Sequence, residues 1–149
     1  MRIFLIDDDS VDSQIVRRVL KGLEGAHELV AFSNAGDALR ELKREFEAPE
    51  CAPARGVAPD LVLLDLNMPG MSGFDFLRET RSDVRFTGIP VVVLTTSGLP
   101  SDVQACFEQG VDGYFVKPLE YAQFADLLTR IIDYWRLCET PQRSLTILH

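Results

Sequence analysis

Short apolar runs alternate with amphipathic segments five times along this chain, and this alternation constrains the fold more than any other feature. The apolar runs, which we interpret as strands, cover residues 2–6, 27–32, 61–64, 89–96 and 113–118. The amphipathic segments, which we interpret as helices, cover residues 11–21, 35–46, 74–81, 101–109 and 121–138. The third and fourth runs are apolar on both faces, as is typical of parallel strands that helices cover on both sides. The sequence therefore predicts an α/β fold with a five-stranded parallel sheet between two helical layers.

The composition narrows the class of protein further. The 149 residues allow one domain with a sizeable core, and the net charge of −8 disfavours a nucleic-acid partner. No apolar run reaches the roughly 20 residues that span a bilayer, and residues 1–9 lead straight into acids, unlike a signal peptide. The cysteines, Cys51, Cys106 and Cys138, lack metal-site spacing, which favours reduced thiols in a cytoplasmic protein.

Local signals predict where helices and loops begin. We expect Asp9 or Ser10 to cap the first helix, and Ser101 to open the fourth helix as part of a capping box. The apolar face of the first helix would consist of Val11, Ile15, Val19 and Leu23. Residues 47–60 contain three prolines and a glycine, so we expect a surface loop there.

Polar side chains follow the predicted strands at their carboxyl ends. The first strand is followed by Asp7, Asp8 and Asp9, the third by Asp65, and the fourth ends in Thr95, Thr96 and Ser97. Lys117, followed by Pro118, ends the fifth strand. Because sites in parallel α/β sheets form just beyond the carboxyl ends of the strands, we expect these side chains to lie together.

Clustered carboxylates at this edge predict a metal site. Carboxylates repel one another, and a hard divalent cation such as Mg²⁺ or Mn²⁺ relieves the repulsion. We expect Asp8 and Asp65 as direct ligands, the backbone carbonyl of Asn67 as a third, and Asp7 acting through a metal-bound water. The three consecutive acids alone could serve only the helix dipole, but the polar residues at the other strand ends favour the metal.

An aspartate beside a cation, an ammonium group and a hydroxyl is suited to phosphoryl transfer. Asp65 would attack, Lys117 and the metal would neutralise the phosphoryl oxygens, and the Thr95 hydroxyl would bond one of them. Lys117 could instead be a snorkelling surface lysine, although a cis bond to Pro118 would aim it into the site. Thr95 could be an ordinary strand residue.

Four motifs resemble those of the receiver domains of two-component response regulators. They are LIDDDS (5–10), LLDLNMPGMSG (63–73), VVVLTTS (91–97) and GVDGYFVKP (110–118), and the match runs over about residues 1–138. The resemblance implies a flavodoxin-like (CheY-like) fold with strand order 2-1-3-4-5, the order for which the chemotaxis receiver is a standard example. It also implies particular roles, with Asp65 as phosphoacceptor, Asp7 and Asp8 as acidic pair, Asn67 as metal-binding carbonyl, Thr95 as switch hydroxyl, Lys117 as active-site lysine and Tyr114 as switch aromatic. Tyr114 could also be an ordinary half-buried strand residue.

Three later segments resemble the small response regulators that partner phytochrome-type histidine kinases. They are PVVVLTTS (90–97), VKPLEYAQF (116–124) and IIDYW (131–135). The resemblance implies a stand-alone phosphorelay switch without a DNA-binding domain, which promotes its own phosphorylation and dephosphorylation but turns over no conventional substrate. The kinase, a bacteriophytochrome, would dock on Ile15 or Val16 and on the turn after Lys117. Glu120, in place of a capping aspartate, and the loop at 47–60 depart from this subgroup.

The last predicted helix carries more apolar residues than one buried face requires, which suggests a subunit interface. We expect a homodimer through the fourth helix, fifth strand and fifth helix. The tail at 139–149 would act as an arm, or would be a disordered chain end.

Two other functions fit part of the pattern. Asp7 and Asp9 match the DxD motif of a Mg²⁺-dependent phosphohydrolase that forms an aspartyl phosphate, but that function would leave Asp65 unexplained. A dimerisation module with an idle site would leave the acids, Thr95 and Lys117 unexplained.

Overall fold

The computed structural model describes residues 1–47 and 58–141. These residues form strands β1 (Arg2–Ile6), β2 (Glu28–Phe32), β3 (Leu61–Leu64), β4 (Val91–Thr95) and β5 (Gly113–Val116). They also form helices α1 (Ser10–Gly22), α2 (Ala35–Glu47), α3 (Gly73–Arg81), α4 (Pro100–Glu108) and α5 (Tyr121–Leu137). The strands pair in parallel in the order β2-β1-β3-β4-β5, which confirms the predicted fold class and strand order.

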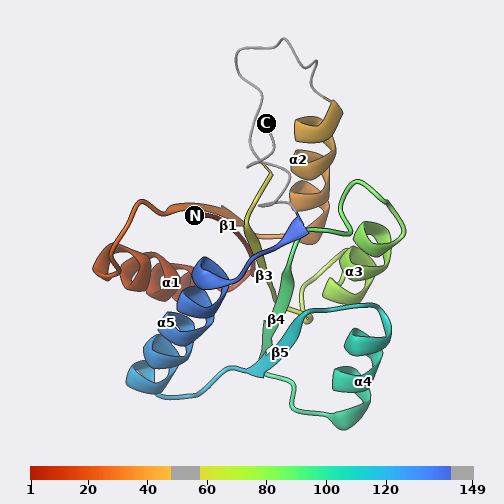
Figure 1. Ribbon diagram of the computed structural model, residues 1–149. Helices are drawn as coiled ribbons and strands as arrows, with labels where there is room; N and C mark the ends of the chain where they lie inside the picture. The colour runs from red at the N-terminus through yellow and green to blue at the C-terminus, as the bar shows by residue number, and fades with distance from the viewer. Residues whose placement is uncertain (48–57, 142–149) are drawn as a thin grey trace.

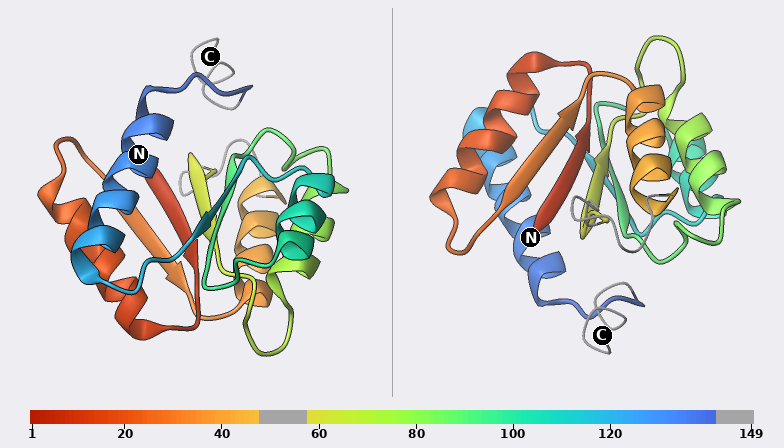
Figure 2. Two further views of the ribbon diagram at one scale, coloured as in Figure 1. Left: turned by 90° about the horizontal axis from the view of Figure 1, so that it is seen from below. Right: turned by 90° about the horizontal axis from the view of Figure 1, so that it is seen from above.

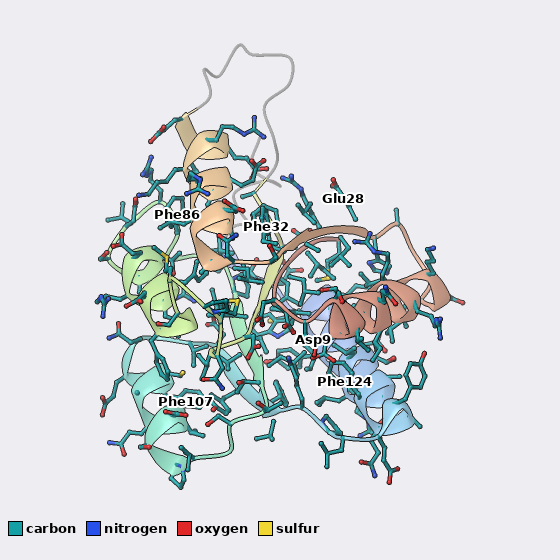
Figure 3. The ribbon with its side chains drawn as sticks, turned by 180° about the vertical axis from the view of Figure 1, so that it is seen from behind. Asp9, Glu28, Phe32, Phe86, Phe107 and Phe124 are labelled. Carbon is teal, nitrogen blue, oxygen red and sulfur yellow. The ribbon has the colours of Figure 1, made fainter. Side chains whose placement is uncertain are left out.

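Helices cover both faces of the sheet. Helices α1 and α5 lie on one face, and α2, α3 and α4 lie on the other (Figures 1 and 2). Alternate residues of β3 enter the two cores, Val62 and Leu64 on the α2–α3–α4 side and Leu61 and Leu63 on the α1–α5 side. Figure 3 labels one aromatic of each core, Phe86 and Phe124 respectively. All residues of β3 and β4 are buried, which explains why their sequences show no polar alternation.

Helix α1 starts close to the predicted residue, and most of its predicted apolar face packs against the core. The Asp9 side chain accepts hydrogen bonds from the backbone N–H groups of Val11 and Asp12 and therefore caps the helix. Val16 and Leu20 are buried, and the predicted residues Ile15, Val19 and Leu23 pack against the same core. Val11 is 62% exposed, so the prediction that it lies on the inner face was wrong. Because Val16 is fully buried, the prediction that it docks a kinase is also wrong.

Helix α4 lacks the predicted capping box. The helix begins at Pro100, whose fixed φ suits a first helical position. The residue at the N-cap position is Leu99, and its side chain makes no capping hydrogen bond. Ser101 therefore lies inside the first turn. The capping box in this structure belongs to α3, where Ser72 and Asp75 bond each other's backbone N–H groups.

At the amino ends of β4 and β5, Arg81 joins three segments of chain through a side chain that is 12% exposed. Arg81 pairs with Asp112 at 2.9 Å, and its guanidinium also donates to backbone carbonyls. These carbonyls belong to Phe86, Thr87, Ile89 and Gly110, at 3.1–3.3 Å. Asp112 in turn accepts a bond from the backbone N–H of Val91 at 2.8 Å. We call these groups the Arg81 cluster.

Two predicted segments cannot be compared in full with the structure. The predicted loop at 47–60 and the tail at 139–149 lie largely outside the described residues. Within the described ranges, none of the helices combines the length and the apolar character needed to cross a membrane.

Candidate functional site

The parallel register brings the predicted polar residues to one edge of the sheet. The backbone N–H of Asp7 donates to Phe32 at 3.0 Å, and that of Asp65 donates to Ile6 at 2.9 Å. On the other side of β3, the N–H of Lys117 donates to the carbonyl of Thr95 at 2.7 Å. Residues from four strands thus reach the same carboxyl edge, next to Asp9 at the start of α1 (Figure 3).

Three carboxylates at this edge form a donor set for a divalent cation. Asp7, Asp8 and Asp65 each offer one oxygen, and these oxygens lie within 4.8 Å of one another. Asp7 and Asp65 are buried, whereas Asp8 is exposed, so a cation can enter the site from solvent on the side of Asp8. Close, partly buried carboxylate oxygens are the ligands that hard divalent cations take, and the residues present fit such an ion.

The turn after β3 lies against the third carboxylate. The backbone N–H of Asn67 donates to Oδ1 of Asp65 at 3.4 Å. Gly70 has φ +79°, a backbone conformation that residues other than glycine rarely adopt. The turn thereby brings the backbone of Asn67 next to the cluster, where its carbonyl is the predicted third ligand.

Asp7 is bonded through both carboxylate oxygens. Oδ1 accepts the N–H of Asp9 at 2.9 Å and Oδ2 accepts Nζ of Lys117 at 2.7 Å. Burial raises the pKa of Asp7 to about 6, although the bonds from Lys117 and Asp9 oppose that rise. The carboxylate of Asp7 is therefore costly to ionise, and the ammonium of Lys117 partly offsets that cost.

Lys117 points into the site and is only 7% exposed. Its Nζ lies 2.7 Å from Asp7, 2.7 Å from Asp12 and 3.6 Å from Asp65. Burial opposes the charged ammonium, but the bonds to Asp12 and Asp7 outweigh it and raise the pKa of Lys117 above its ordinary value. We call these four residues the Lys117 cluster.

The interpretation of Lys117 as a snorkelling surface lysine is wrong, and so is the expected cis bond to Pro118. None of the peptide bonds between described residues is cis. Three carboxylates, rather than the proline, direct the ammonium inward.

Asp12 is the member of this cluster that the sequence analysis missed. It lies in the first turn of α1, four residues after Asp8. The first turn of this helix adjoins the carboxyl edge of the sheet, so an acid there can reach the lysine at the same edge. An acid in the first turn of the helix that follows the acidic strand end is the signal that could have identified it.

The predicted switch residues are linked through Ser97. Thr95 is fully buried, and its Oγ1 accepts the N–H of Ser97 at 3.5 Å. Tyr114 is half-buried, and its hydroxyl donates to the carbonyl of Ser97 at 2.7 Å. The hydroxyl of Ser97 donates to Asp102 in α4. A movement at Thr95 can therefore reach both Tyr114 and α4 through one short loop.

Gly73 allows α3 to start directly against the backbone of Asp65. Its N–H donates to the carbonyl of Leu66 at 3.2 Å. A Cβ at this position would overlap the carbonyl oxygen of Asp65 and lie 2.8 Å from Cα of Leu66. The absence of a side chain at Gly73 therefore supports the position of the strand end that carries Asp65.

Asp9 does not belong to the acidic cluster. Its carboxylate caps α1, and the described carboxylates close enough to share a cation are Asp7, Asp8 and Asp65. The DxD arrangement expected of a phosphohydrolase therefore has no second acid in the site.

Comparison with known proteins agrees with this geometry. The family model of the response regulator receiver domain matches residues 3–129. The response regulator Rcp1 of Synechocystis sp. is 35% identical over 133 residues, which cover 89% of this chain and 87% of Rcp1.

Solved structures show the same architecture. The phosphorylated cyanobacterial phytochrome response regulator RcpA superposes with a TM-score of 0.84 at 31% identity, over 94% of this chain and 97% of that chain. The Mn²⁺-bound form of Rcp1 superposes with a TM-score of 0.82 at 33% identity, over 94% and 98% respectively. Because the family model covers most of the chain and these relatives match over almost their full length, the chain belongs to the response regulator receiver domains, the phosphoacceptor switches of two-component signalling.

Proposed function

We propose that Asp65 is the phosphoacceptor and that a sensor histidine kinase supplies the phosphoryl group from a phosphohistidine. A carboxylate oxygen of Asp65 forms the new bond to phosphorus while the bond from phosphorus to the imidazole nitrogen breaks. The electron pair of that bond stays on the histidine, which becomes neutral or takes up a proton. The product is an aspartyl phosphate on a signalling protein that turns over no conventional substrate.

The position of Asp65 relative to Lys117 and the other acids is the observation that carries this proposal. Its Oδ2 lies 3.6 Å from the ammonium of Lys117, and its carboxylate belongs to the set whose oxygens lie within 4.8 Å of one another. Lys117 is therefore close enough to neutralise an oxygen of a phosphoryl group on Asp65. The buried Thr95 at the end of the neighbouring strand supplies a hydroxyl for another oxygen.

The cation proposed for the site is Mg²⁺, with Mn²⁺ as a substitute. Asp8, Asp65 and the backbone carbonyl of Asn67 would hold it directly, and Asp7 would hold it through water because both Asp7 oxygens already accept hydrogen bonds. When bound, the cation supplies positive charge against the phosphoryl oxygens. The Mn²⁺-bound structure of Rcp1 supports a divalent ion in a protein of this kind.

The output surface is proposed to be α4, β5 and α5. Phosphorylation would draw the hydroxyl of Thr95 toward the new oxygens and change its contact with Ser97, which holds Tyr114 and α4. Such a change is a shift between two populations, biased by the local contacts of the phosphoryl group.

The kinase is proposed to be phytochrome-type, acting in the cytoplasm. Support comes from RcpA, which is described as a cyanobacterial phytochrome response regulator. Ile15 on α1, which is half-buried, and the turn after Lys117 remain the proposed docking surface. In that turn Leu119 is fully exposed, and Val11 on α1 is 62% exposed, so both can contribute apolar contacts.

A homodimer through α4, β5 and α5 is also proposed, with residues 1–138 as the receiver domain and 139–149 as an arm. A groove of about 340 Å³ runs between β5 and α5, lined mainly by Phe115, Leu127, Ile131, Tyr134 and Trp135. Beside it Tyr134 is 62% and Leu137 is 75% exposed. Sedimentation of the full chain and of a chain cut after Cys138 tests the arm, and equal dimer affinity would rule it out.

Phosphorylation of the purified protein tests the proposed function. With Mg²⁺ and acetyl phosphate, intact-mass spectrometry should show one phosphoryl adduct, and fragmentation after reduction with borohydride should locate it at Asp65. Transfer from a purified phytochrome-type kinase should give the same adduct. An adduct at another residue, or none with either donor, would refute the proposal.

A further inference from the structure

Lys117 shares its ammonium unequally among three carboxylates. Nζ lies 2.7 Å from both Asp7 and Asp12, but 3.6 Å from Asp65. Asp7 comes from the end of β1 and Asp12 from the first turn of α1. In this arrangement the two short contacts of the lysine are with residues at the start of α1 and just before it. Asp65, the proposed phosphoacceptor, is the most distant of the three carboxylates.

We propose that Asp12 is a positioning residue that holds Lys117 against α1 and thereby opposes the binding of a phosphoryl group on Asp65. The inference rests on the proposed roles of Asp65 and Lys117. A group added to Asp65 brings new anionic oxygens next to Lys117, whose Nζ lies 3.6 Å from Asp65. The ammonium has a third N–H for such an oxygen, but its charge is already shared with two carboxylates at 2.7 Å, so these carboxylates compete with the new contact.

The exposure of the two short partners indicates which contact is given up. The side chain of Asp7 is 3% exposed, and that of Asp12 is 20% exposed. A buried carboxylate that loses its cation pays a large desolvation cost, whereas a partly exposed one recovers water in its place. Asp12 is therefore the partner that Lys117 leaves.

This exchange makes Asp12 a competitor of the phosphoryl group for one ammonium. Removing its charge while keeping its shape weakens the competition, because Lys117 then has only Asp7 as a short charged partner. The bond between Lys117 and Asp7, and the donors for the cation, stay as they are. The expected result is tighter binding at Asp65.

Asp9 offers a matched control three residues earlier. Its carboxylate is also near the acidic edge and also belongs to the start of α1, but its hydrogen bonds go to the backbone N–H groups of Val11 and Asp12 and not to Lys117. Asparagine caps helices as well as aspartate does, so Asp9→Asn removes one charge and keeps the cap. Any difference between the two variants reports the contact with Lys117 rather than the net charge.

Beryllofluoride, which binds aspartates as a phosphoryl mimic, serves as the probe together with Mg²⁺. Titrations followed by fluorine NMR should show Asp12→Asn binding roughly three- to fivefold more tightly than wild type, the upper part of the range of an exposed ion pair. Asp9→Asn should stay within about twofold of wild type. Asp12→Glu, which restores the carboxylate, should return the affinity toward wild type. Urea unfolding of each variant checks the fold, and Asp12→Ser replaces Asp12→Asn if that variant does not fold.

The outcomes separate this inference from the proposed function. If wild type binds no beryllofluoride in the presence of Mg²⁺, the proposed function fails. If wild type binds and Asp12→Asn matches Asp9→Asn, or binds more weakly than wild type, only the role of Asp12 is overturned.

Discussion

Two largely buried cations at opposite ends of β5, Arg81 and Lys117, show how differently one protein can use an ion pair. The Arg81 cluster, at the amino end, sets one guanidinium against one carboxylate, Asp112, and four backbone carbonyls. The Lys117 cluster, at the carboxyl end, sets one ammonium against three carboxylates, with Asp8 as a fourth nearby. The first is balanced in charge, whereas the second has an excess of negative charge.

The balance decides what each cluster contributes. Neutral pairing with many carbonyl acceptors stabilises the joined segments, and nothing further needs to bind. Carboxylates in excess repel one another and destabilise the folded state unless a cation binds between them. Such a cluster therefore indicates a binding site. Changes in the Arg81 cluster should therefore alter stability, and changes in the Lys117 cluster should alter chemistry.

The largest expected effect is the loss of chemistry at the acidic end. Asp65→Asn should give no phosphoryl adduct with acetyl phosphate and Mg²⁺, because an amide cannot act as the nucleophile. Asp112→Asn changes the same functional group at the opposite end and should still be phosphorylated. Intact-mass spectrometry measures both, and an adduct on Asp65→Asn would remove the distinction between the two ends.

A large loss of stability is expected at the balanced end. Arg81→Ala should lower the free energy of unfolding by about 2–4 kcal/mol, because it leaves Asp112 and several carbonyls without their donor. Urea unfolding measures this change. The control is Arg78→Ala, whose exposed pair with Asp75 should contribute less than about 1 kcal/mol. Equal losses in both variants would contradict the structural role of the Arg81 cluster.

A gain of stability is expected when the excess charge at the acidic end is reduced. In EDTA, Asp8→Asn should raise the free energy of unfolding by about 1 kcal/mol, since one repelling carboxylate is gone. Adding millimolar Mg²⁺ should stabilise wild type, because an ion that binds only the folded state raises the free energy of unfolding. The variant lacks one ligand of the ion and should stay almost unchanged. Urea unfolding with and without Mg²⁺ measures both effects. Stabilisation of the variant by Mg²⁺ equal to that of wild type would show that the ion binds elsewhere.

The smallest expected effect is a pH dependence. Folding raises the pKa of Asp7 from 3.8 to about 6, so the folded state binds the proton more tightly than the unfolded chain. The contribution of Asp7 to stability is therefore largest at low pH and is lost as pH rises through about 6. Asp7→Asn cannot ionise, and in EDTA its gain over wild type should be larger at about pH 7.5 than at about pH 5, by roughly 1 kcal/mol. A gain that is equal at both values would show that burial does not perturb Asp7.

The fold and most of the site could be predicted because both follow from the position of strand ends. Apolar runs set where the strands stop, and parallel pairing brings those stops to one edge. The sequence therefore predicts that Asp7, Asp65, Thr95 and Lys117 lie together, and the structure brings them to the same edge.

The errors come from features that depend on side-chain direction or on distant partners. The inner face of α1 depends on how the helix is rotated against α5, so Val16 was mistaken for a docking residue and Asp12 was overlooked. Arg81 was not singled out because its partners lie 5 to 31 residues away and four of them are backbone carbonyls. The sequence pattern contains no sign of the Arg81 cluster, whereas the position of Asp12 in the first turn of α1 is a signal that can be read from the sequence.

Gly73 has a consequence for anyone who would transplant this chemistry into another scaffold. The aspartate and the glycine eight positions later form one steric unit, because the helix carrying the glycine touches the peptide group of the aspartate. A graft that copies only the acids and the lysine would push that helix outward and tilt the nucleophile. In a library of random variants, we expect position 73 to tolerate fewer substitutions than the exposed acid Asp8.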